Sequence, residues 1–245
     1  MWGPSASGKT ALLAQIYLRA QAAEGDWKVF VTRESRTLVL RESDRIEREN
    51  YFPMGTPVGV QEPITYHFKH EPTSSEFTLR TIDRAGAMYE DLPQEIRDGL
   101  RDADAMVLLV DHHRQVNDKE VRDALMQVHL DRDLGTGRDL RPVAICLSKA
   151  DELIHSSQDY RRAVDNPAEF VRPHLGPELL QWIGQHYANF ELFPVSAAGL
   201  KLSYGRIGRS VFFDENFQVR VSQAGTPFNH LTPFTWVFAQ LSRGR

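Results

Sequence analysis

The residues best suited to chemistry are the first ten, which read Met1-Trp-Gly-Pro-Ser-Ala-Ser-Gly-Lys-Thr10. They fit the pattern G-x-x-x-x-G-K-[ST], the Walker A pattern of a phosphate-binding loop, at every fixed position. Glycines at both fixed positions allow backbone angles that a Cβ opposes, so successive N–H groups can surround an anion. Lys9 can reach the β- and γ-phosphates, and the Thr10 hydroxyl can ligate Mg²⁺. We therefore predict a nucleotide site formed by Gly3, Pro4, Ser5, Ala6, Ser7, Gly8, Lys9 and Thr10, with Lys9 also acting in catalysis.

A second group of candidate ligands follows a predicted strand at residues 77–82 and reads Asp83-Arg-Ala-Gly86. An aspartate at the end of a strand beside a phosphate loop can hold Mg²⁺ through a water. A glycine three residues later can offer its N–H to a γ-phosphate. D-x-x-G alone is a turn-like string, but its position after a strand and downstream of the loop makes it informative. Asp83 is predicted to be a metal ligand together with Thr10, and Gly86 to be catalytic.

Two later strands end in residues that can recognise a guanine base. The predicted strand at 143–147 is followed by Ser148, Lys149 and then Asp151, whose carboxylate can accept from guanine N1 and N2. Adenine cannot donate in that pattern, and the Lys149 stem can lie along the base. Ser196 and Ala197 follow the next strand, where a backbone N–H can meet guanine O6. Ligands of open α/β sheets bind at the carboxyl ends of strands, so all five residues are predicted to share one site.

The apolar periodicity of the chain predicts alternating helices and strands that position these residues. The runs at 105–110 and 143–147 are continuously apolar, which is typical of parallel strands buried on both faces. The fold class expected is α/β, a doubly wound and mostly parallel sheet with helices on both faces, as in P-loop NTPases. The strand at about 64–69 is expected to run antiparallel to the rest. Because only Met1 and Trp2 precede the phosphate loop, the first strand is expected to be missing or truncated, or replaced by another segment.

Composition and length limit the possible classes of protein. The chain has 245 residues and no linker or repeat, so we predict a single domain with insertions at about 27–55 and 201–230, the second a hairpin. A formal net charge of −4 does not indicate binding to nucleic acid or to an anionic membrane. The sequence contains no apolar run long enough to span a bilayer. The single cysteine, Cys146, excludes an intrachain disulfide and favours a reducing, cytoplasmic setting. Its apolar neighbours indicate a core residue.

The nine histidines do not suggest a metal site by their spacing. His112 and His113 follow a predicted strand, but adjacent side chains on an extended segment point in opposite directions, so joint chelation is not expected. The zinc-protease, paired-cysteine and serine-hydrolase motifs are all missing from the sequence.

The four motifs together resemble the signature of the TRAFAC class of GTPases, which includes Ras-like and translation-factor G domains. Residues 3–10 are similar to the first motif of that class, 83–86 to the third, 148–151 to the fourth and 196–197 to the fifth. The resemblance covers nearly the whole chain. It implies a guanine nucleotide as ligand and Mg²⁺ as cofactor.

Within that class, the pattern is most similar to bacterial double-GTPase-type families. This resemblance implies that Thr56, in Tyr51-Phe-Pro-Met-Gly-Thr56-Pro, is the switch-I threonine, a metal ligand and a catalytic residue, and that the first insertion precedes switch I. Thr65 is the alternative, although it lies within a predicted strand. Thr56 as an ordinary turn residue remains a second alternative. Resemblance to these families also implies a protein effector.

Two positions depart from the family pattern. The fourth motif usually begins with asparagine, whose amide ties the base loop to the phosphate loop, and Ser148 is shorter. Ala87 stands where Ras-like proteins often carry a glutamine that orients water, so hydrolysis is expected to be slow or to depend on another group. Arg84, Glu90 or a partner's residue are candidates for that group.

Three functions remain open on the sequence alone. The leading hypothesis is a guanine-nucleotide-binding protein that hydrolyses GTP slowly with Mg²⁺ and acts as a conformational switch. The alternative is a non-hydrolysing pseudo-GTPase that serves as an interaction module. The third is an ATP-using P-loop enzyme such as a small kinase, in which Ser-Lys-Ala-Asp would be a coincidence.

Overall fold

The computed structural model describes residues 1–4, 6–22, 26–52, 61–84, 93–113, 115–203, 206–222 and 225–243. Its helices, in chain order, are α1 (Lys9–Ala22), α2 (Arg33–Glu47), α3 (Gln94–Asp102), α4 (Gln115–Asp131), α5 (Ser157–Asp165), α6 (Pro167–Val171), α7 (Pro177–His186) and α8 (Thr232–Arg243). None of these described helices is both long and apolar enough to cross a membrane.

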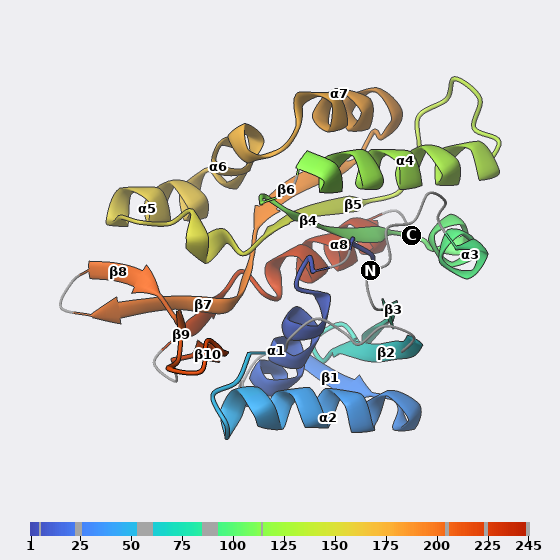
Figure 1. The fold of residues 1–245 in the computed structure, drawn as a ribbon. Helices are drawn as coiled ribbons and strands as arrows, with labels where there is room; N and C mark the ends of the chain where they lie inside the picture. Colours follow the sequence, from blue (N-terminus) through green and yellow to red (C-terminus); the bar gives the residue numbers. More distant parts are fainter. Residues whose placement is uncertain are drawn as a thin grey trace.

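The central sheet consists of three parallel strands in the order β4 (Met106–Asp111), β5 (Val143–Ser148) and β6 (Phe190–Pro194). Every residue of β4 and β5 is buried, which confirms the expectation from their continuous apolar runs. In Figure 1 the helices α4 and α7 lie above this sheet and α8 lies below it. The result is an α/β arrangement with both faces of the sheet covered.

Among the described residues, the two large core clusters lie on opposite faces of the central sheet, because alternate residues of a strand point to opposite faces. Leu108 and Ile145 belong to the cluster that includes residues of α4 and α7. Leu109 and Cys146 belong to the other cluster, together with residues of α1, α8 and β2. Cys146 is fully buried, and burial raises the pKa of its thiol far above the ordinary value. The prediction that it is a core residue is confirmed.

A second sheet is antiparallel and has the order β1 (Trp27–Val31), β2 (Gln61–His70) and β3 (Ser75–Arg84). The antiparallel direction expected near residues 64–69 is therefore confirmed. The expectation that these strands form one mostly parallel sheet is wrong for the described residues, since β1–β3 and β4–β6 form separate sheets and the first of these is antiparallel. Helices α1 and α2 pack against each other and against this second sheet.

The first residues of the chain lie between the two sheets. Trp2 forms a parallel bridge with Leu108, donating its N–H to Val107 O at 2.9 Å and accepting from Leu109 N at 2.9 Å. The Met1 amino group donates to Arg80 O of β3 at 2.6 Å. Trp2 thus holds the position beside β4 where the strand before a phosphate loop is expected. The chain turns into the loop at Gly3, so Trp2 and Leu108 are the one residue pair that joins the N-terminal segment to β4 among the described residues.

The last third of the chain adds five short strands around the carboxyl end of β6. They are β7 (Ser196–Ser203), β8 (Arg206–Arg209), β9 (Val211–Phe213), β10 (Val219–Val221) and β11 (Thr226–Phe228). The expected hairpin is confirmed as the antiparallel pair of β9 and β10. β7 pairs with both β8 and β11, and the β7–β8 hairpin projects away from the central sheet in Figure 1.

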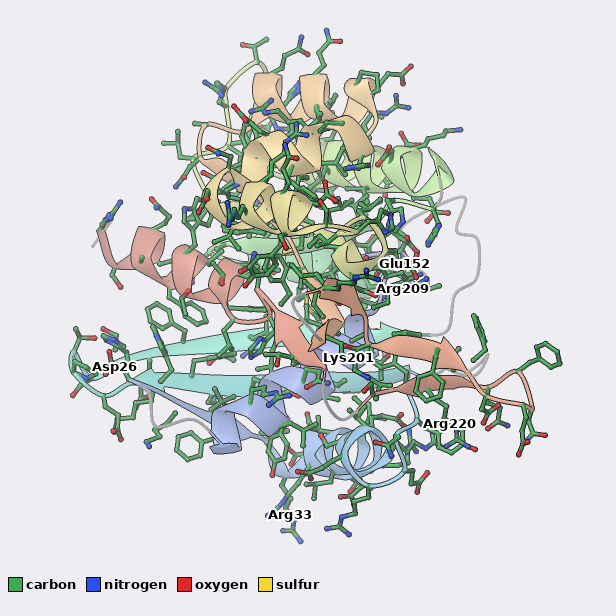
Figure 2. All side chains as sticks on the ribbon, turned by 90° about the vertical axis from the view of Figure 1, so that its left-hand side faces the viewer. Asp26, Arg33, Glu152, Lys201, Arg209 and Arg220 are labelled. Carbon is green, nitrogen blue, oxygen red and sulfur yellow. The ribbon has the colours of Figure 1, made fainter. Side chains whose placement is uncertain are left out.

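The two predicted insertions contact each other at Tyr51 and Arg220. These residues form an antiparallel bridge, and the Arg220 guanidinium lies over the Tyr51 ring at 3.3 Å from its centre. Phe52 N donates to Val219 O at 3.2 Å, which continues the pairing by one residue. Figure 2 shows Arg220 above the end of α2. The segment leading into residues 53–60 is therefore anchored on β10.

Candidate functional site

The phosphate loop runs from Gly3 to Thr10, between the Trp2 bridge and α1. A Cβ on Gly3 would lie 2.7 Å from Leu109 O, so only glycine allows this close approach to β4. Gly8 has a φ of +82°, in the left-handed region that glycine adopts without strain. The two fixed glycines of the motif thus serve two different purposes, contact with the sheet and the turn of the loop.

Lys9 is buried and closes over the loop that precedes it. Its Nζ donates to Gly3 O at 2.7 Å and to Pro4 O at 2.8 Å. Ser7 is fully buried, and its Oγ has no hydrogen-bond partner among the described residues. A buried hydroxyl without a partner is uncommon, and an anion inside the loop would supply an acceptor for it. Thr10 follows Lys9 in the first turn of α1, half-buried.

Several predicted phosphate and metal residues have no described side chain. Ser5, Thr56 and Gly86 lie outside the described residues. Asp83 lies in β3, where its backbone pairs with Glu62, and the strand continues to Arg84 instead of ending at residue 82. The roles given to these residues stay predictions.

The predicted base-recognition residues come together at the carboxyl ends of β5 and β6. Asp151 lies in a short 3-10 turn, η1 (Ala150–Glu152), directly after β5, and Ser196 is the first residue of β7. Ser196 Oγ donates to Asp151 Oδ1 at 2.5 Å and accepts from Gly199 N at 2.8 Å. Ala150 N also donates to Val195 O at 3.1 Å. The fourth and fifth motifs, distant in sequence, are therefore joined by hydrogen bonds into one loop pair.

Asp151 combines deep burial with a charge that the fold must stabilise. The residue is only 2% exposed, and burial raises the pKa of its carboxyl above the ordinary value. The hydrogen bond from Ser196 and the nearby Arg209 charge act in the opposite direction, and the Glu152 charge adds to the effect of burial. A carboxylate in such a place has a strong preference for ligands that donate N–H groups.

Ser148 and Lys149 bind to β4 in this structure. Ser148 Oγ donates to Val110 O at 3.1 Å, so its short side chain ties β5 to β4. Lys149 has a φ of +56°, and its Nζ lies 2.5 Å from Asp111 Oδ2. Ala197 follows Ser196 in β7 and is half-buried. Asp111, at the carboxyl end of β4, thus orients the lysine that is predicted to lie along the base.

The geometry of His112 and His113 differs from the expected extended segment. Both residues lie in a turn, held by a hydrogen bond from His113 N to Asp111 Oδ1 at 3.0 Å, and their ring centres are 4.0 Å apart. Ligand atoms of Asp111 and the two histidines lie within 4.8 Å of one another. The premise that the two side chains point in opposite directions is therefore wrong. The carboxylates beside them already bind cations, since Asp111 binds Lys149 and Glu152 contacts Arg209.

Sequence reasoning missed three charged residues of this region. Asp111 directly follows the apolar run of β4, and its position at a strand end was a usable signal. Glu152 contacts both His113 and Arg209, and Arg209 extends from β8 to η1. No local pattern marks Arg209, because its placement depends on the path of the β7–β8 hairpin.

One described pocket lies at the opposite end of the central sheet. It is lined by residues that precede β4, β5 and β6, namely Asp104, Pro142 and Asn189, together with parts of α3 and α8. Amino ends of parallel strands are not where open α/β sheets bind their ligands, so the motif-bearing end remains the candidate site.

Replacing Ser196 by alanine is expected to weaken the predicted binding of a guanine nucleotide roughly 10- to 100-fold, because a hydrogen bond to a charged group contributes roughly 1.5–3 kcal/mol. Loss of the donor raises the pKa of Asp151 further, so the effect should grow as the pH falls. Ser210→Ala is the control, since Ser210 is buried and its Oγ has no partner among the described residues. Equal losses in both variants, measured by fluorescence titration, would contradict this role for Ser196.

Comparison with known proteins gives one family and a distant structural likeness. The family model Double-GTPase 2 matches residues 1–207. A similar solved structure is the ADP-ribosylation-factor-like GTP-binding protein, small COPII coat GTPase SAR1, of Encephalitozoon cuniculi in complex with GDP. It is 14% identical, with 78% of each chain covered and a TM-score of 0.32. No curated protein matches the chain.

Proposed function

Because this chain belongs to the Double-GTPase 2 family, we propose that it binds guanine nucleotides, hydrolyses GTP slowly with Mg²⁺ and acts as a conformational switch. Family membership supports the binding of GTP. The observation that carries the proposal is the hydrogen bond of 2.5 Å by which Ser196 holds the buried Asp151 carboxylate at the carboxyl end of the sheet.

The preference for guanine follows from the donors and acceptors of this loop pair. An ionised carboxylate only accepts hydrogen bonds, and guanine donates from N1 and N2 on a single edge. Adenine presents an unprotonated ring nitrogen at that edge and would face the carboxylate with a lone pair. A buried carboxylate left without donors costs several kcal/mol, so the site rejects adenine strongly.

The phosphate side of the site rests on the loop and the first turn of α1. Lys9 would exchange its two carbonyl acceptors for phosphate oxygens, and the Ser7 hydroxyl would gain an acceptor. The α1 N-terminus adds its dipole. Thr10, Asp83 and Thr56 are the proposed ligands of Mg²⁺. Magnesium, when bound, neutralises charge on the β- and γ-phosphate oxygens.

The slow rate that we propose rests on the residue after the D-x-x-G motif. Alanine at position 87 cannot orient a water molecule, so catalysis would consist of positioning and charge neutralisation. Lys9, Thr56 and Gly86 are the proposed catalytic residues. Contacts with GTP and Mg²⁺ would hold the segments around Thr56 and after Arg84, and hydrolysis would release both segments. A protein effector would bind one of these two conformations in preference to the other.

A pseudo-GTPase interaction module is the second candidate function. Ser148 donates to β4, so it does not supply the tie to the phosphate loop that the usual asparagine makes. A weaker tie between the two halves of the site favours low nucleotide affinity. Nucleotide-independent binding of a partner, or stable binding of GTP without turnover, would support this function instead.

Equilibrium binding of fluorescent GDP and GTP analogues with Mg²⁺ tests the proposal directly. Micromolar or tighter affinity is expected, with displacement by unlabelled GTP and not by ATP. Phosphate release is then followed under single-turnover conditions, where a slow but measurable rate is expected. Displacement by ATP as effective as by GTP would contradict the guanine assignment, and no binding of either analogue would contradict the proposed function.

A further inference from the structure

Arg209 places a cationic group beside the base-recognition loop from a strand outside the four motifs. Figure 2 shows Arg209 and Glu152 side by side, one on β8 and the other on η1. The Arg209 guanidinium donates to Glu152 Oε1, while Arg209 Nε lies 3.7 Å from Asp151 Oδ2. Arg209 therefore touches one carboxylate of this turn and lies near the other.

The two carboxylates therefore have different relations to the same cation. A separation of 3.7 Å exceeds the range of an N–H···O hydrogen bond, so Asp151 Oδ2 does not accept a hydrogen bond from Arg209. The positive charge nevertheless acts across that distance. The Asp151 side chain is buried, so solvent screens the interaction only from the side of Arg209, whose side chain is 42% exposed. Glu152 takes the hydrogen bond and keeps the guanidinium beside Asp151.

The charge matters because Asp151 binds guanine only as a carboxylate. Burial opposes that form, and the charge of Glu152 opposes it further. Ser196 on β7 and Arg209 on β8 favour it. Near the turn, the Lys149 amine lies on Asp111, and the rings of His112 and His113 lie against Glu152.

We propose that Arg209 is a positioning residue for guanine recognition, held by Glu152 so that it stabilises the ionised Asp151 carboxylate and leaves its oxygens open to the base. The inference rests on the proposed function. It assigns a part in nucleotide binding to β8, a strand that lies outside the four motifs.

The first test compares GDP affinity across pH for the wild type, Arg209→Ala and Arg209→Lys. Arg206→Ala is the matched control, because Arg206 is an exposed arginine on the same strand. In Arg209→Ala the loss should be small at mildly alkaline pH and reach roughly tenfold at mildly acidic pH, as expected for a nearby opposite charge. Lysine should restore most of the affinity. A loss independent of pH, or a loss equalled by the control, would contradict the proposal.

The second test removes the group that holds Arg209. In Glu152→Ala the guanidinium is free to bind Asp151 directly and to compete with the base, so GDP should bind roughly three- to tenfold more weakly at neutral pH. Adding Arg209→Ala to this variant should restore part of the affinity. If the double variant is weaker than either single variant, the two residues act independently and the inference fails.

A readout without nucleotide separates this inference from the proposed function. Carbon NMR of the Asp151 carboxyl, assigned with Asp151→Asn, gives its titration in the free protein. The midpoint should move to higher pH in Arg209→Ala and remain unchanged in Arg206→Ala. An unchanged midpoint with normal GDP binding overturns the role of Arg209 alone. A shifted midpoint in a protein that binds no guanine nucleotide overturns the proposed function and with it the role in recognition.

Discussion

Asparagine in place of Asp151 is expected to weaken GTP and GDP binding by about 100-fold or more and to favour xanthosine nucleotides. The variant loses an acceptor for guanine N2 and presents an amide donor there, which leaves two donors facing each other. Xanthine carries a carbonyl oxygen at that position and restores the pairing. Because the site is buried, water cannot replace the missing partner.

Competition by GTP, XTP and ATP against a fluorescent nucleotide measures this exchange of preference. Asp165→Asn is the control, since Asp165 is an exposed aspartate at the end of α5. Burial raises the pKa of the Asp151 carboxyl above its ordinary value. At a pH above the ordinary aspartate pKa, the buried charge therefore lowers the free energy of unfolding. The unliganded variant should therefore melt no lower than the wild type. A folded variant that still selects GTP would refute the base assignment.

Removal of the Lys9 amine is expected to abolish tight triphosphate binding, with a loss on the order of 1000-fold or more. The amine now bridges two carbonyls of the loop, and no other described lysine is buried there. In Lys9→Ala the phosphates lose a charge-assisted partner, and two carbonyls lose their donor. GDP should be affected less than GTP, since the γ-phosphate contact exists only in the triphosphate.

Lys9→Gln separates the charge from the shape of the loop. Its amide can still donate to the carbonyls, so the loop should remain folded while the charge is lost. Lys69→Ala serves as the control because Lys69 is exposed on β2. Titration with fluorescent GTP and a thermal melt of each variant are the measurements. GTP affinity unchanged in Lys9→Gln would show that the charge has no role in phosphate binding.

The parts of the fold that the sequence predicts well are those with a strong local signal. The continuous apolar runs identify β4 and β5, since only a strand covered on both faces tolerates them. The motifs at the ends of β5 and β6 also predict that Asp151 and Ser196 share a site. Strand ends in a parallel sheet lie at one edge, so the contact follows from topology.

The features that the sequence does not predict depend on distant contacts or on local turns. The two sheets are separate, and the first residues of the chain contact both of them, Trp2 through its bridge to β4 and Met1 through its hydrogen bond to Arg80 O of β3; no periodicity reveals these contacts. Arg209 reaches Glu152 only because the β7–β8 hairpin returns toward η1. His112 and His113 come together because Asp111 accepts a hydrogen bond from the backbone and forms a turn there.

The bridge between Trp2 and Leu108 also has a consequence for the order of folding. It joins two segments that are far apart in sequence, so the entropy of closing a long loop opposes its formation. Hairpins such as β2–β3 join neighbouring segments and can form early. The phosphate loop therefore takes its final shape only after β4 is in place. A nucleotide that binds this loop therefore binds only chains in which the bridge between Trp2 and Leu108 has formed. By mass action, such binding shifts the folding equilibrium toward the native state.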